Sequence, residues 1–222
     1  MNKLRDWRDI GVAGGFTTED VGRLLGIPPR TLGAWLRGER PLIHPDYEPI
    51  NGSLILSFDA FVEARAIAHF LEEGVDPARL REIMDGLRRS TGHLHPLASD
   101  RKLVTDGFRL LELTDDGRLV NLANEVYAHN DLMKPALVGR IVFEAGKARY
   151  FLPDPNEAPL VRVDPRLAFG RPVVFEPGKR VVETAALAAT AEDEGLQEAA
   201  DWFDVTVDAA RQALQFERRL AA

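Results

Sequence analysis

Residues 17–37 carry the pattern that most restricts the fold, because two short amphipathic segments meet there at a tight turn. Apolar residues recur at helical spacing on both sides of the turn: Val21, Leu24, Leu25, Leu32, Trp35 and Leu36. Gly26 suits the end of the first helix, and Pro28-Pro29 suits the start of the second. Helices this short bury such faces only against each other and a third helix. The segment therefore predicts a helix-turn-helix.

The exposed side of the second predicted helix carries small or basic residues. Such a surface can approach the major groove of DNA closely, and arginine can contact bases or phosphates. The candidate DNA-contacting residues are Arg30, Thr31, Gly33, Ala34, Arg37 and Arg40. Residues 1–40 hold seven Lys/Arg and five Asp/Glu, a balance of +2, whereas the whole chain has a formal net charge of -7. The alternative is an ordinary helical hairpin used only for packing.

Three regions follow one another along the chain, at residues 1–92, 93–159 and 160–222. The first and third show mainly helical periodicity, and the middle one is rich in residues that favour strands. We therefore expect a mainly α fold with a small α+β middle region, a winged helix-turn-helix at the N-terminus and a three-helix, helix-turn-helix-like domain at the C-terminus.

The first region should contain two longer helices and a wing. Thr17 or Thr18 can cap the first short helix. Ser57 and Asp76 are suitable caps for the longer helices. The expected ranges are helices at 58–73 and 77–89, with a wing at 38–57 that contains strands at 41–43 and 54–56.

The middle region combines predicted strands with one helix. The expected elements are strands at 102–113, 119–122 and 148–152, a hairpin turn at 114–118, a helix at 130–142 and a linker at 153–159. These strands have no other evident purpose, so this region is a candidate for contacts within a homodimer.

The third region should begin with extended chain at 160–163 and end in three short helices, at 184–194, 196–203 and 206–220. Residues 183–222 hold nine acids and three arginines, a balance of -6, and phosphate should be repelled by that surface. We therefore expect the last two helices to bind protein rather than DNA, although they look like a second helix-turn-helix. The alternative is that the acids form a solvated face.

Several kinds of chemistry find no support in this chain. The absence of cysteine excludes disulfides, thiolate zinc sites and cysteine nucleophiles. The first residues lack the apolar core of a signal peptide, and no stretch of about 18 apolar residues occurs. We therefore expect a cytoplasmic protein without membrane contact.

Candidate catalytic and metal-binding groups are few. Of the five histidines only His93 and His95 lie close together, and between Gly92 and Pro96 they fall in a predicted loop. Asp115-Asp116 fits a turn better than a catalytic carboxylate pair. No phosphate-binding loop or hydrolase motif occurs. We expect no enzyme activity, metal or cofactor, and an enzyme built on the α+β region is the alternative.

The segment from Thr17 to Pro28, followed by Arg30 to Leu36, resembles the MerR-like winged helix-turn-helix family. The expected wing and the helix that starts at Phe58-Asp59 fit the same pattern. In that family the second helix reads DNA, so the resemblance implies the same role here.

Residues 163–174 form a second unusual string, with a turn at Asp164-Pro165 and a tight corner at Gly170-Arg171-Pro172. Followed by three short helices, it resembles an antitoxin-associated domain family long catalogued as of unknown function. Members are often encoded beside PIN-domain ribonuclease toxins. The resemblance covers about residues 160–217, but after Val174 the chain departs from the Gly-Thr-Arg-hydrophobic-Pro-Thr stretch of the family.

Together the two segments are similar to a VapB-type antitoxin of the longer, two-domain kind. This resemblance implies a homodimer that binds operator DNA, represses its own operon and neutralises a PIN-type ribonuclease toxin. The candidate toxin-contacting residues are Arg171, Arg180, Trp202, Arg218 and Arg219. The alternative is a stand-alone transcriptional regulator whose other regions sense a ligand or dimerise.

Overall fold

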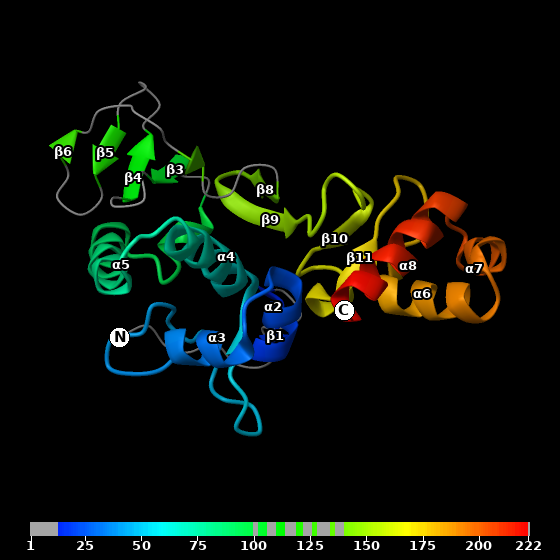
Figure 1. The fold of residues 1–222 in the computed structure, drawn as a ribbon, viewed down its shortest axis with the longest axis horizontal. Helices are drawn as coiled ribbons and strands as arrows, with labels where there is room; N and C mark the ends of the chain where they lie inside the picture. The colour runs from blue at the N-terminus through cyan, green and yellow to red at the C-terminus, as the bar shows by residue number, and fades with distance from the viewer. Residues whose placement is uncertain are drawn as a thin grey trace. The chain divides into compact units, whose positions relative to one another are not determined.

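The computed structural model describes residues 13–99 and 140–221, together with the backbone of five strands between residues 102 and 135. The chain forms two compact units, one built mainly on residues 16–138 and the other mainly on residues 149–222 (Figure 1). Both units contain helices as well as β-strands, so the fold is mixed α and β.

Helices dominate the first part of the first unit. Its elements are β1 (Phe16–Thr17), α2 (Thr18–Leu25), α3 (Pro29–Trp35), β2 (Ile55–Leu56), α4 (Phe58–Glu72), α5 (Pro77–Thr91) and a 3-10 turn (Pro96–Ala98). Strands β1 and β2 pair antiparallel, with Phe16 opposite Leu56. The ring centroids of Phe16 and Phe61 lie 5.1 Å apart, and Phe58 stacks on Phe61 at 5.8 Å. This aromatic cluster packs the strand pair against α4.

Side-chain caps set the starts of the two longer helices. The Ser57 hydroxyl accepts a hydrogen bond from the Ala60 N–H at 3.2 Å, and the Asp76 carboxylate caps α5 in the same way. The helices expected at 58–73 and 77–89 are confirmed, with α5 slightly longer than predicted.

A five-stranded antiparallel sheet follows α5 within the first unit. Its strands are β3 (Lys102–Thr105), β4 (Leu110–Leu113), β5 (Leu119–Asn121), β6 (Val126–Tyr127) and β7 (Lys134–Pro135), in the order β6-β5-β4-β3-β7. Leu113 of β4 lies opposite Leu119 of β5, as the expected hairpin requires. The predicted turn of this hairpin, at 114–118, lies outside the described residues. The strand-favouring segment at 102–113 forms two strands, β3 and β4, which pair antiparallel.

A second five-stranded antiparallel sheet, most of which belongs to the second unit, precedes three helices. Its strands are β8 (Ile141–Glu144), β9 (Lys147–Phe151), β10 (Val161–Val163), β11 (Pro172–Val174) and β12 (Val182–Glu183), in the order β12-β11-β10-β9-β8. The helices are α6 (Thr184–Asp193), α7 (Leu196–Phe203) and α8 (Val207–Ala221), close to the expected spans. Val161 and Val163 are fully buried, which places them in the core of this unit.

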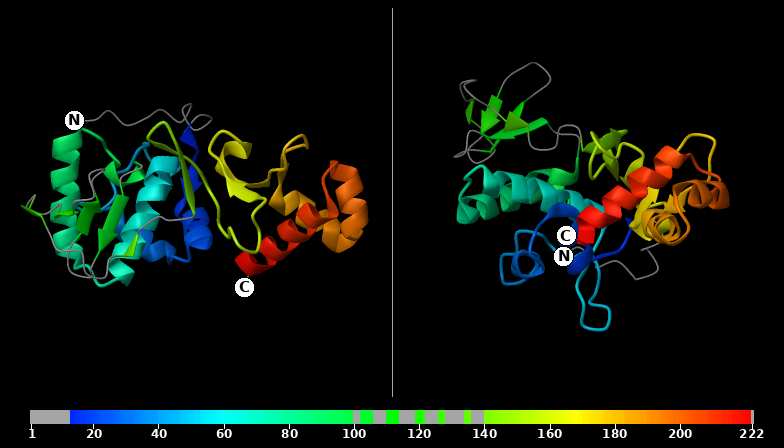
Figure 2. Two further views of the ribbon diagram at one scale, coloured as in Figure 1. Left: turned by 90° about the horizontal axis from the view of Figure 1, so that it is seen from above. Right: turned by 45° about the vertical axis from the view of Figure 1, so that its right-hand side comes forward.

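Helices α6, α7 and α8 pack against one another, and α6 and α8 also contact the second sheet (Figure 2). Buried alanines such as Ala199 and Ala210 let these helices approach closely. The side-chain oxygen of Gln212 on α8 accepts a hydrogen bond from the Leu160 N–H at 3.0 Å, which joins α8 to the start of β10. In the described part of the chain, every helix is too short or too polar to cross a bilayer.

The expected fold class, mainly α with a small α+β middle region, is wrong in its proportion of helix to strand. The sequence predicts short extended segments after residue 160, but β10, β11 and β12 join β8 and β9 in one continuous sheet. Their β-branched residues favour strands. The corners at Asp164-Pro165 and Gly170 interrupt the pattern, so each piece is too short to show that it belongs to a sheet.

The helix expected at 130–142 is also wrong, because β7 occupies Lys134–Pro135 and β8 begins at Ile141. Proline removes a backbone donor that a helix interior needs. The strand expected at 54–56 is confirmed as β2, but residues 41–43 form no strand. The Ile43 N–H donates to the Trp35 carbonyl at 3.1 Å, so this segment is hydrogen-bonded to the end of α3 instead of to another strand.

Replacing Phe61 by alanine tests the aromatic cluster of the first unit. The Phe61 side chain is fully buried, so we expect the free energy of unfolding to fall by about 3–5 kcal/mol in urea denaturation followed by circular dichroism. The matched control is Trp202→Ala at an exposed aromatic residue, where a change within about 0.5 kcal/mol is expected. Equal losses in both variants would contradict this packing.

Candidate nucleic-acid interface

Local contacts define both ends of α2. The Thr17 hydroxyl accepts from the Asp20 N–H at 3.1 Å, and the Asp20 carboxylate accepts from the Thr17 N–H at 3.1 Å. Gly26 ends α2 with φ of 70°, a left-handed conformation that favours glycine. The predicted N-cap at Thr17 and the predicted helix end at Gly26 are therefore confirmed.

Gly22 sets how closely the two helices approach. A Cβ atom at this position would lie 2.7 Å from the carbonyl oxygen of Ile27 and 3.2 Å from Cγ of Pro29. The Ile27 N–H also donates to the Gly22 carbonyl at 3.0 Å. Only glycine fits this contact without a backbone shift, a requirement that was not predicted from the sequence.

Two of the predicted DNA-contacting residues lie on one face of α3, and a third follows the helix. Arg30 and Ala34 are exposed and four residues apart on α3, and Arg37 is exposed two residues after the helix ends at Trp35. Thr31 is half-buried beside them. The opposite face, which includes Leu32, is buried in the core.

Gly33 is buried because Arg37 lies across it. The Arg37 Nη1 atom is 2.8 Å from the position that a Cβ on Gly33 would occupy. Within the described residues, neither Arg30 nor Arg37 forms an ion pair with an acidic side chain. The guanidinium groups of these two arginines therefore keep their donors available to an anion.

Arg40, by contrast, is engaged by another helix. Its Nη2 and Nε atoms donate to the Asp85 carboxylate on α5 at 2.6 and 3.1 Å. The hydrogen bond to Asp85 and the attraction of that carboxylate raise the pKa of Arg40 above its ordinary value. Arg40 thus joins the segment after α3 to α5 and is less available than Arg30 or Arg37.

Between α3 and α4 the chain forms a projecting loop with a tight turn at its tip. Ile50 and Ser53 exchange backbone hydrogen bonds of 3.0 and 2.9 Å around Asn51 and Gly52. Both turn residues have positive φ, at 51° and 80°, as a short hairpin turn requires. The loop ends at β2, whose pairing with β1 fixes it beside the start of α2.

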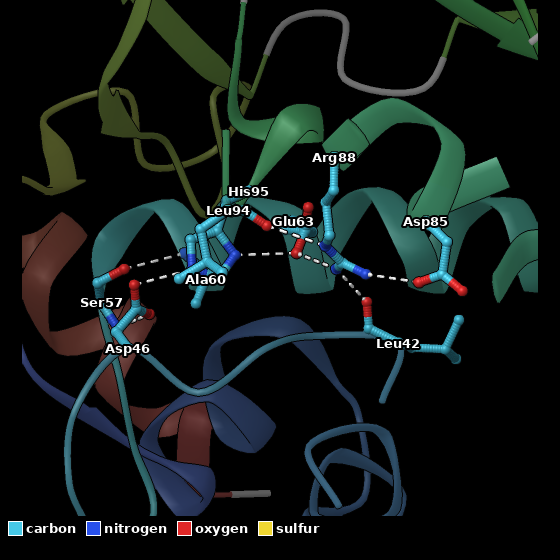
Figure 3. A network of polar contacts seen from close by, with 9 residues as sticks. All are labelled: Leu42, Asp46, Ser57, Ala60, Glu63, Asp85, Arg88, Leu94 and His95. Atoms are coloured by element: carbon cyan, nitrogen blue, oxygen red, sulfur yellow. Dashed lines mark hydrogen bonds and ion pairs between the residues drawn. The ribbon is translucent and has the colours of Figure 1, made fainter. Parts of the chain in front are cut away.

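A buried polar network anchors this loop to the helices behind it (Figure 3). The His95 Nε2 atom lies 2.8 Å from Asp46 Oδ1, and its Nδ1 atom lies 2.9 Å from Glu63 Oε2. Asp46 also accepts from the Ser57 N–H at 3.1 Å. His95 therefore bridges the loop, through Asp46, to α4, through Glu63.

Arg88 of α5 extends the network to four segments. Its Nη2 atom donates to the Leu42 carbonyl at 2.6 Å and lies 3.3 Å from Glu63 Oε2. Its Nε atom donates to the Leu94 carbonyl at 3.0 Å. A single guanidinium thus ties the segment after α3 to α4, to α5 and to the chain that carries His95.

The electrostatics of the network favour a protonated imidazole. Burial lowers the pKa of His95, but attraction to Glu63 and hydrogen bonds to Asp46 and Glu63 outweigh it and raise that pKa to about 10. Burial raises the pKa of Asp46, but the contacts with His95 and Ser57 hold it below its ordinary value. The protonated ring of His95 therefore donates from both nitrogens, one to Asp46 and one to Glu63.

His93 and His95 do not form a joint site. His95 is buried in the network, whereas His93 is exposed. Among the residues that the structure describes, no group of three or more His, Asp or Glu side chains has the arrangement of a metal site. This network was not predicted from the sequence, although Glu63, an acid among the buried residues of α4, is a signal for it.

The predicted partner-contacting residues lie in the second unit, and most of them are paired within it. Arg171 lies 3.3 Å from Glu183, Arg218 lies 3.1 Å from Glu192, and Arg219 lies 2.8 Å from Asp154. Arg180 and Trp202 are exposed. The Arg219 contact attaches the segment 153–159, expected to be a linker, to α8.

Exchanging Gly22 for alanine should destabilise the α2–α3 pair. We expect a loss of about 1–3 kcal/mol in the free energy of unfolding, because the Ile27 carbonyl has to move. Gly86→Ala in α5 is the matched control, since its Cβ would meet nothing within 4 Å and alanine is the better helix former. Urea denaturation that shows the same sign for both variants would contradict this close approach.

The raised pKa of His95 makes stability depend on pH above neutrality. The ordinary value of 6.5 applies to the unfolded chain and about 10 to the folded one, so this contribution is complete below 6.5 and is lost toward 10. From about pH 7 to about pH 9, we expect a loss of up to about 2–3 kcal/mol. Urea titrations at each pH should show this loss.

His95→Gln should be less stable at neutral pH and lack this component, whereas His93→Gln should keep the wild-type profile. Identical profiles for the wild-type chain and His95→Gln would show that the imidazole is not charged in the folded state.

No protein-family model matches this sequence, and no curated protein matches it. Among solved structures, the chain is similar to Rv2018 from Mycobacterium tuberculosis, with a TM-score of 0.62 and 23% sequence identity. The match covers 90% of this chain and 96% of that chain. The likeness therefore extends to the fold over nearly the whole of both proteins.

Proposed function

We propose that this chain binds double-stranded DNA through the exposed face of α3. The proposal rests on Arg30 in α3 and on Arg37, which follows α3 and whose side chain lies back over Gly33 of that helix. Both arginines are exposed, Ala34 lies between them in the sequence, and neither has an acidic partner among the described residues. A small residue between two guanidinium groups lets a helix approach a groove while the arginines reach base edges or phosphates.

The surrounding structure supports a rigid presentation of that face. The glycine contact at Gly22 closes α2 onto α3, and the network around His95 holds the loop that follows α3. The tip of this loop, at Asn51-Gly52, is exposed and polar, which suits contact with the sugar–phosphate backbone. This combination agrees with the resemblance to the MerR-like family.

We further propose that the chain is an antitoxin that represses its own operon as a homodimer and binds a PIN-type ribonuclease toxin. The antitoxin role rests on the resemblance of residues 160–217, and dimerisation rests on the usual need to read two half-sites. The second unit supports a division of labour, because the balance of residues 183–222 is -6 and such a surface repels phosphate.

Arg30→Ala and Arg37→Ala test the DNA proposal. The probe is a duplex that covers the region upstream of the reading frame encoding this chain, compared with an unrelated duplex of equal length. We expect each substitution to weaken binding about tenfold in fluorescence anisotropy, and loss of a phosphate contact should also lower the salt dependence by about one counterion.

Arg211→Ala is the matched control, since Arg211 is an exposed arginine on α8 in the acidic second unit. Its affinity for the duplex should equal that of the wild-type chain. Unchanged affinity in both α3 variants, or an equal loss in the control, would contradict the assignment to α3.

Co-expression with the adjacent gene tests the antitoxin role. We expect the two gene products to purify as a complex that still binds the upstream duplex. We also expect this chain to relieve the growth arrest that the product of the adjacent gene causes when it is expressed alone. A chain that binds DNA but neither binds nor neutralises that product would favour the stand-alone regulator.

A further inference from the structure

We propose that the exposed face of α7 binds a protein surface rich in lysine and arginine, with Trp202 as its central contact. This rests on the proposed function, because it takes the second unit to be the protein-binding part. It adds which residues make the contact and which chemistry the partner presents.

Trp202 is unusually exposed for a side chain of its size. Its relative exposure is 74%, and within the described residues it makes no stacking or cation–π contact. Tryptophan has a large apolar surface and is enriched at the centres of protein interfaces. Its position on a well-formed helix holds this surface in a fixed direction.

The rest of α7 divides cleanly into a packed face and an open one. Ala199 and Ala200 are buried in the three-helix group. The open face carries Gln197, Glu198, Asp201 and Trp202, whose spacing of one, three and one residues forms a continuous stripe. The tryptophan therefore lies beside two carboxylates on one helix face.

The charge of this part of the chain selects the partner. Residues 190–208 contain seven acids and neither lysine nor arginine. Three of these acids are paired to bases elsewhere in the unit, through Glu192–Arg218, Asp204–Lys179 and Asp208–Arg211 contacts of 3.1, 2.8 and 2.8 Å.

The four other acids have no basic partner among the described residues: Asp193, Glu194, Glu198 and Asp201. A cationic surface would complete this face in two ways. Guanidinium groups form paired hydrogen bonds with carboxylates, and a cation over the indole ring is attracted by its negative face. Nucleic acid and acidic proteins would be repelled instead.

Phe169, which is also an exposed aromatic residue in the described part of the chain, lacks this combination. Phe169 is 66% exposed, but its neighbours Arg166 and Arg171 contact the acids Asp164 and Glu183 at 3.6 and 3.3 Å. The charges around it are balanced within the unit, so they select no partner. The face of α7 is therefore the better defined docking surface.

Isothermal titration calorimetry of the full chain with the purified product of the adjacent gene tests this inference. Trp202→Ala should weaken the complex at least about tenfold. The double variant Glu198→Gln/Asp201→Asn should weaken it at low salt and have a smaller effect at high salt. Gln215→Ala at an exposed position on α8 is the matched control and should bind as the wild-type chain does.

The outcomes separate this inference from the proposed function. Trp202→Ala should keep the wild-type melting temperature and affinity for the upstream duplex, and Arg30→Ala should keep affinity for the protein partner. Wild-type affinity in Trp202→Ala would overturn the α7 site and leave the antitoxin role intact.

Failure of the wild-type chain to bind the product would overturn both the antitoxin role and this inference. A Trp202→Ala chain that loses its own dimer but keeps the partner would identify a second copy of the chain as the occupant, and it would also overturn the inference.

Discussion

The first unit depends on one buried interaction, the pair of hydrogen bonds that the charged His95 makes with Asp46 and Glu63. Charged groups are costly to bury unless they are paired and hydrogen-bonded, and here Arg88 pairs with Glu63 while the Ser57 N–H donates to Asp46. Glu63 Oε1 and Arg88 Nη1 are buried without a hydrogen-bond partner among the described residues. The loop after α3, the helices α4 and α5 and the segment after α5 all meet here. The position of the proposed DNA-binding face relative to its support follows from this contact.

Local signals in the sequence were sufficient to predict the α-helices that the structure contains, but they also predicted a helix at 130–142 that does not form, and they did not define the sheets. Thr17, Gly26, Ser57 and Asp76 act through neighbours a few residues away, so caps and ends could be predicted. The strands after residue 140 pair with the strands next to them in the chain, but each is short and irregular loops separate most of them, so neither their register nor their number could be predicted. The contacts of His95 with Asp46 and Glu63 span 49 and 32 residues, which hides them from any local pattern.

The partners of the arginines could not be predicted from the sequence either. In the sequence every arginine outside the core is a candidate DNA or protein contact, whereas the structure shows which of them pair with acids of the chain. Arg40 and Arg219 form ion pairs with Asp85 and Asp154 and thereby join segments of the chain, whereas the guanidinium donors of Arg30 and Arg37 are available to an anion. The chain therefore presents a small basic face in one unit and an acidic face with an exposed tryptophan in the other. Two faces of opposite charge suit two different classes of partner.

Photo-cross-linking can show whether α3 lies against DNA. A benzophenone side chain placed at Ala34, between the two available arginines, should cross-link to the upstream duplex under ultraviolet light. The same group at Ala186, an exposed alanine on α6 in the acidic unit, should not. DNA binding through α3 would be contradicted by cross-links from position 186 but not from position 34. It would also be contradicted if position 34 gave no cross-link under conditions where the chain binds the duplex.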